Sequence, residues 1–131
     1  MSSVAREFVT KAKADWVTAR REAAATQDYN PDAVCFHAQQ CVEKLMKALL
    51  IFHGQKAPKT HDLFELDRLL VLADASWKSD PLDLQVLVPA AVDYRYPGVS
   101  ATKIEAELAF AAAERVRRVA GPFLVKFGES I

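Results

Sequence analysis

The sequence predicts an all-α fold of about five helices. Apolar residues recur with the 3.6-residue period of a helix over five stretches. Capping residues, or an Asn or Asp followed by Pro, precede most of these stretches. No stretch shows the alternation of a half-buried strand. We expect residues 1–131 to form a single domain, because this length suffices for a core without disulfides or metal.

The central helix is predicted over residues 31–53. Asn30 is its expected cap, Pro31 takes the first helical position, and Gly54 ends it. One broad face is apolar, and Phe36, Leu50 and Ile51 interrupt the opposite, polar face. A helix of this kind touches neighbours on both sides. We therefore assign a partner-facing role to four polar residues, with a solvated face as the alternative: Gln40, Glu43, Lys44 and Lys47.

Two further helices flank this one. Residues 4–25 carry a stripe of alanines around Trp16, which is expected to be a core anchor. Thr60 is the expected cap of a helix that runs to about Asp74. His61, in its first turn, is expected either to cap or pack, or to line a functional groove.

The C-terminal half contains two more predicted helices. Residues 82–92 are apolar nearly all round, so this helix should be buried, and Pro89 should kink or split it. Thr102 and Glu105 form a capping box that opens the last long helix, which Gly121-Pro122 should end or bend. The tail Phe123, Leu124 and Phe127 needs cover, and a homodimer would supply it.

Composition bounds the function. Seventeen basic and seventeen acidic residues cancel, so no overall field favours nucleic acid or anionic membranes. No apolar run approaches the length of a membrane span and the N-terminus lacks a signal-peptide pattern, so we expect a cytoplasmic protein without a membrane partner.

The cysteines and histidines suggest no cofactor. Cys35 and Cys41 lie roughly 9 Å apart along one predicted helix, too far to bridge each other, and we expect reduced core cysteines. His37 and Cys41 have no second ligand pair at a suitable spacing, so we predict neither a metal site nor a cofactor.

Five motifs follow one another over nearly the whole chain: AKADWVTA, HAQQCVEKLMKALLIFHG, KTHDLFEL, DYRYPG and IEAELAFAAAERV. In sequence and in order they resemble those of the HEPN family (higher eukaryote and prokaryote nucleotide-binding domains). The resemblance implies an up-and-down antiparallel bundle of four long helices plus a shorter one, assembled as a homodimer. It also implies a nucleotide-binding module, a partner of a small nucleotidyltransferase in a toxin–antitoxin-like pair, or both.

The chain departs from the catalytic members of that family. Those metal-independent ribonucleases carry an arginine followed, after four to six residues, by a histidine. Arg95 matches the arginine, but no histidine occurs after His61. We therefore expect no ribonuclease activity, because the group that would take the 2′-hydroxyl proton is missing.

Arg95 is the residue that we expect to be functional. Its guanidinium can offer a bidentate fork to the phosphate of a nucleotide or RNA, and Tyr94 or Tyr96 can stack on a base. His61 completes the predicted ligand-binding set. Pairing with Asp93, which would staple the turn, is the alternative role for Arg95. Two other functions stay open: a ribonuclease toxin that uses Arg95 with an unorthodox base such as His61, and a purely structural dimer.

Overall fold

The structure, a computed structural model, describes residues 3–131 except for the side chains of Val92 and Arg95. This part of the chain contains no strand, so the all-α prediction is confirmed. None of its helices is long and apolar enough to cross a membrane. The elements in chain order are α1 (Ser3–Ala23), α2 (Pro31–Phe52), α3 (Leu63–Ala73), α4 (Pro81–Val92), the 3-10 helix η1 (Asp93–Arg95) and α5 (Lys103–Val125).

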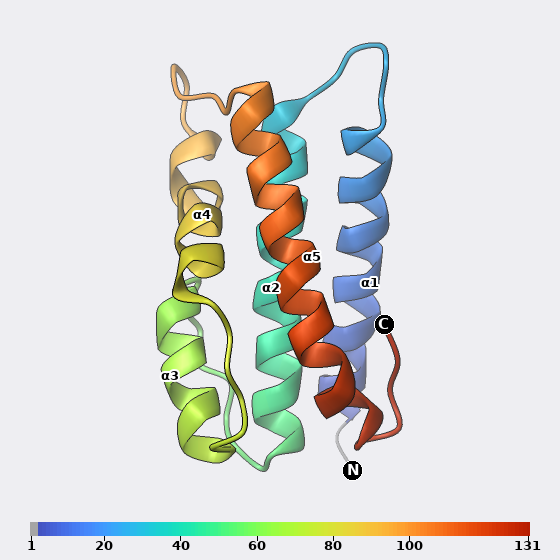
Figure 1. Cartoon of the computed structure of the whole chain (residues 1–131), viewed down its shortest axis with the longest axis vertical. Helices are drawn as coiled ribbons and strands as arrows, with labels where there is room; N and C mark the ends of the chain where they lie inside the picture. Colours follow the sequence, from blue (N-terminus) through green and yellow to red (C-terminus); the bar gives the residue numbers. More distant parts are fainter. Residues whose placement is uncertain (1–2) are drawn as a thin grey trace.

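The helices form a bundle of four columns (Figure 1). Three columns are the long helices α1, α2 and α5. The short helices α3 and α4 stand end to end beside them and together take the place of a fourth long helix (Figure 1). The central position that we predicted for α2 is confirmed, since α2 packs against each of the other four α-helices. Asn30 caps it as expected, accepting a hydrogen bond from the Ala33 amide at 3.1 Å.

The second apolar face of α2 is covered within the chain itself. Leu50 is fully buried, and Phe36 and Ile51 are partly buried. These burials need no second copy, because the α3–α4 column packs on the side of α2 that faces away from α1 (Figure 1).

The C-terminal tail is also covered, so the expectation that it needs a partner is wrong. Phe127 stacks on Phe52 with ring centroids 4.9 Å apart, and Leu124 is fully buried. Phe123 lies edge-on against Trp77, 5.4 Å away. These contacts join residues far apart in sequence, which is why the local pattern could not show them.

The cap of α3 differs from the prediction, and neither Pro89 splits its helix nor Gly121-Pro122 ends the last one. Asp62 caps α3 in place of Thr60, accepting from the amides of the first helical turn. Pro89 lies inside a continuous α4, and Gly121-Pro122 lies inside α5. Each proline frees the carbonyl of an exposed residue four positions earlier, Gln85 or Arg118, and water can satisfy that carbonyl. The capping box of Thr102 and Glu105 is present as predicted.

Candidate functional site

The outward surface of α4 is apolar and uncovered, so the predicted burial of this helix is wrong on one side. Its inner side is buried against α2 and α5 by residues such as Leu84 and Leu87. On the other side no described element covers it, and Leu82 remains 67% exposed. We call this surface the α4 outer face; its residues are Leu82, Gln85, Val86, Val88 and Pro89.

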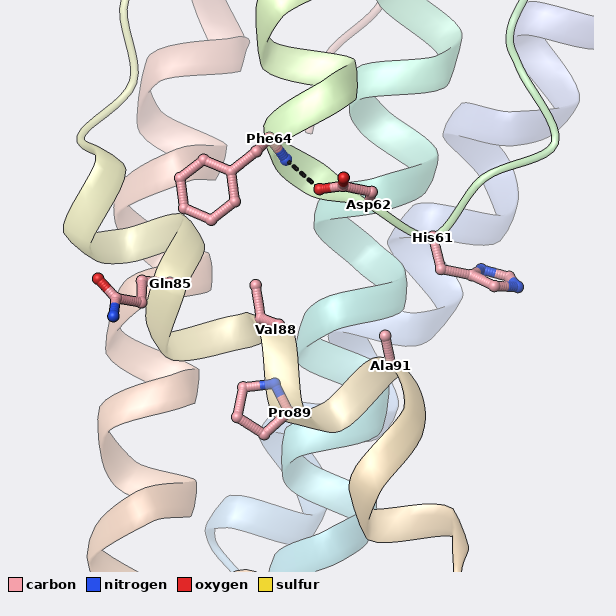
Figure 2. A pocket seen from close by; sticks show the side chains of 7 residues that line it. All are labelled: His61, Asp62, Phe64, Gln85, Val88, Pro89 and Ala91. Carbon is pink, nitrogen blue, oxygen red and sulfur yellow. Dashed lines mark hydrogen bonds between the residues drawn. The ribbon is translucent and has the colours of Figure 1, made fainter.

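A groove of about 660 Å³ adjoins this face, between the start of α3 and the second half of α4. Figure 2 shows Phe64 reaching from α3 toward α4, above Val88 and Pro89. The ring of His61 points away from these apolar side chains (Figure 2). His61 therefore stands at the rim of the groove, and the floor is apolar, as in most ligand and partner grooves.

His61 is held by a buried carboxylate, Glu43. Its Nδ1 lies 2.9 Å from Glu43 Oε1, which also accepts a hydrogen bond from Gln39 Nε2 at 3.0 Å. Lys47 Nζ donates to Glu43 Oε2 at 3.1 Å. A carboxylate only accepts, so Nδ1 of His61 carries the proton and Nε2 is the nitrogen left for other partners.

The four residues predicted to face a partner divide into two pairs. Glu43 and Lys47 are 4% and 8% exposed, buried by the chain itself, so the solvated-face alternative is wrong for them. Gln40 and Lys44 are partly exposed. Gln40 donates to the Gln39 side chain at 2.8 Å. That any of the four contacts a partner stays a prediction.

Asp15 organises a second polar cluster, which the sequence analysis missed. Its two carboxylate oxygens bind His37 Nδ1 at 2.8 Å and Lys44 Nζ at 2.5 Å. Asp15 is buried between α1 and α2. The available signal was its position beside Trp16, on the inward side of an otherwise apolar stripe, where an aspartate needs a partner.

Of the predicted ligand-binding residues, His61 and Tyr94 line different hollows. Tyr94 is half-buried, and its hydroxyl donates to Glu105 Oε2 at 3.2 Å. Burial raises the pKa of Tyr94 to about 12. Tyr96 is exposed, and the side chain of Arg95 lies outside the described part of the structure. His61 lines the groove beside Phe64, whereas Tyr94 lines a separate hollow of about 310 Å³ together with His37.

The cysteines are free and buried, as predicted. Burial raises the pKa of both thiols to about 12, so neither is a thiolate at neutral pH. Within residues 3–131 no three His, Cys, Asp or Glu side chains gather in a way that could hold a metal ion.

Comparisons with known proteins place this geometry in one family. The model of the HEPN domain matches residues 5–122. No curated protein matches the chain. The crystal structure of TT1696 from Thermus thermophilus is similar over 91% of this chain and 97% of its own, with a TM-score of 0.69 and 23% identity. The crystal structure of ST0689, an archaeal HEPN homologue, is similar over 93% of this chain and 99% of its own, with a TM-score of 0.64 and 24% identity. At these identities the two structures support the fold alone.

Proposed function

Because this chain belongs to the HEPN family, we propose that it is a cytoplasmic, dimeric helical module that binds a nucleotide and accompanies a small nucleotidyltransferase, as in toxin–antitoxin pairs. The main support for the proposed dimer is that the α4 outer face is uncovered. A helix that is apolar all round is normally buried, yet Leu82, Val86 and Val88 lie in solvent in the single chain. Contiguous apolar patches of this kind mark interaction surfaces.

A second copy of the chain fits this face better than a charged partner does. Gln85 is its one polar side chain among those described, and no charged side chain belongs to it. In a two-fold dimer the same surface meets itself, so a neutral surface brings no like charges together. The groove beside Phe64 gives the partner's side chains a place to enter.

The dimer is tested by light scattering on the parent and on Val88→Asp at tens of micromolar protein. We expect the parent to have about twice the mass of one 14.5 kDa chain and the variant to be monomeric. Val125→Asp is the matched control, because Val125 is also an exposed valine (65%, against 44% for Val88) but lies at the end of α5. A monomeric parent, or a Val88→Asp variant that is still dimeric, would show that the α4 outer face is not a dimer interface.

Family membership, with the partly exposed Gln40 and Lys44, supports the nucleotidyltransferase partnership. The test is co-expression with a small nucleotidyltransferase from the same organism, followed by purification through a tag on one of the two proteins. We expect the two to co-purify, and Lys44→Glu to weaken the complex. Separate elution of two folded proteins would contradict the partnership.

We further propose that the chain lacks the ribonuclease activity of catalytic family members. The support is that none of the three histidines lies after Arg95, where the motif would need one. Purified protein should leave a labelled RNA intact in the presence of a metal chelator. RNA cleavage that follows the protein through purification would refute this.

One observation favours the alternative of a ribonuclease with an unorthodox base. His37, rather than His61, lines the same hollow as Tyr94, next to Arg95 in sequence. Asp15 holds its Nδ1, which leaves Nε2 to accept a proton. If cleavage occurs, the alternative requires that His37→Ala abolish it and that His61→Ala leave it unchanged.

A further inference from the structure

A cleft separates α1 and α5 on a part of the surface distinct from the α4 outer face. Figure 1 shows α5 crossing the bundle so that its C-terminal end approaches the start of α1 while its beginning lies away from the end of α1. Where the helices diverge, a hollow of about 380 Å³ remains. Small side chains leave it unfilled, since Ala23, Ala24 and Ala106 line it.

The cleft has aromatic walls. Phe110 and Tyr29 both line it. Phe110 is held in place by stacking on Trp16, with ring centroids 4.6 Å apart and planes 13° apart. Trp16 is itself buried, so Phe110 is a rigid wall on which a flat ring can stack.

A guanidinium without a carboxylate partner stands at the cleft. Arg20 lines it, and within the described part of the chain Arg20 makes no ion pair. A second cation, Arg117, lies over the Trp16 ring at 4.0 Å and likewise makes no ion pair there. Burial lowers the pKa of Arg117, while the nearby carboxylate of Glu114 acts in the opposite direction and raises it. Arg117 does not line the cleft, so the guanidinium of Arg20 is the cation available there to an anion.

The remaining polar groups of the cleft, on Glu107 and Tyr29, can accept hydrogen bonds from hydroxyl and amino groups of a ligand. Glu107 lines the cleft, and its carboxylate accepts hydrogen bonds. Tyr29 adds a hydroxyl, whose pKa is raised first by burial and then by Glu107. The cleft therefore offers a stacking wall, an anion-binding cation and an acceptor, within a volume typical of small-molecule sites.

We propose that the cleft between α1 and α5 binds a mononucleotide, whose base stacks on Phe110 and whose phosphate is held by Arg20. Glu107 and Tyr29 then meet the ribose hydroxyls or the amino group of the base. This assigns the nucleotide-binding part of the proposed function to a site that does not include Arg95. The nucleotide site does not depend on dimerisation through the α4 outer face, so the proposed site and the proposed dimer can each fail without the other.

Calorimetric titration with adenosine 5′-monophosphate tests the site. The parent should bind it saturably, and Arg20→Gln should weaken binding by about tenfold or more, because the charge-assisted bond to phosphate is lost. Arg21→Gln is the matched control: Arg21 is an exposed arginine in the same last turn of α1 but does not line the cleft, and its loss should leave the affinity unchanged. Adenosine, which lacks the phosphate, should bind more weakly than the monophosphate and should not distinguish Arg20→Gln from the parent.

A second variant tests the cavity itself. Ala23 is exposed and lines the cleft, so Ala23→Phe should fill the cavity without disturbing the core and should abolish binding. Arg95→Lys should retain full affinity for the monophosphate. Absence of heat with the parent, unchanged affinity in both Arg20→Gln and Ala23→Phe, or loss of affinity in Arg95→Lys would each overturn the assignment. Binding of single-stranded RNA without binding of the mononucleotide would overturn it as well.

Discussion

Glu43 and Lys47 form an ion pair inside the protein, with Lys47 Nζ 3.1 Å from Glu43 Oε2 and side chains only 5% and 10% exposed. On a solvent-exposed helix surface, the loss of an i, i+4 ion pair costs under about 1 kcal/mol. Burial changes that expectation, because removal of one partner leaves the other charge uncompensated in the interior.

Lys47→Ala should therefore lower the free energy of unfolding by about 3–5 kcal/mol, the range for breaking a buried pair. Urea denaturation measures it. Arg118→Ala is the matched control, since Arg118 pairs with Glu114 at the same spacing with 74% of its side chain exposed, and its loss should cost under about 1 kcal/mol. Equal midpoints for the two variants would mean that Glu43 is not buried in solution.

Leu45→Ala should cost about 2–5 kcal/mol, because Leu45 is buried on the central helix and its loss leaves a cavity. The same substitution at Leu108, which is exposed on α5, should cost under about 0.5 kcal/mol. Thermal and urea unfolding of the two variants measure the difference. A Leu45→Ala variant as stable as the parent would place this face of α2 outside the core.

Acid should destabilise the start of α5 through Glu105. Hydrogen bonds from the Thr102 amide, the Thr102 hydroxyl and the Tyr94 hydroxyl lower the pKa of Glu105. A lowered folded-state pKa gives stability that is present above the unfolded value, about 4.3, and is lost as pH falls through the folded value.

Glu105→Gln separates the charge from the hydrogen bonds, because glutamine can still complete the capping box. Melting temperatures between neutral pH and pH about 3 should fall less steeply for Glu105→Gln than for the parent. Parallel curves would show that the Glu105 charge contributes nothing.

The two cysteines should resist thiol reagents in the folded protein. Both are buried, and a thiol whose pKa is about 12 is almost wholly protonated at pH 8. A chromogenic disulfide reagent should find no reactive thiol in native protein and two per chain in denaturant. Rapid reaction of native protein would contradict the burial of α2.

Arg95→Lys tests the role predicted for Arg95 in binding RNA phosphate. If its guanidinium forms a fork to phosphate, the variant keeps the parent's melting temperature and binds a short RNA more weakly, because lysine cannot reproduce the fork. We expect this result in calorimetry and melting curves measured side by side. A lower melting temperature, together with no RNA binding by the parent, would assign Arg95 to stapling the turn.

Local signals in the sequence determined most of the secondary structure. The caps Asn30, Asp80 and Thr102 act on the amides of the next turn, and the apolar period reflects one helix at a time. The sequence by itself therefore predicted the five helices, the central place of α2 and the burial of both cysteines. It also carried the five motifs of the family.

Tertiary structure alone decided which apolar and charged surfaces are covered. Phe127 stacks on Phe52, and Glu43 hydrogen-bonds to His61, although the members of each pair are far apart in the sequence. The α4 outer face stays open because α2 and α5 pack on one side of that helix only. A helical period shows that a face is apolar or polar, but burial depends on which distant segment lies against it. That is why the sequence pattern misjudged the outer side of α4 and the cover of the tail, and did not show that the chain itself buries Glu43 and Lys47.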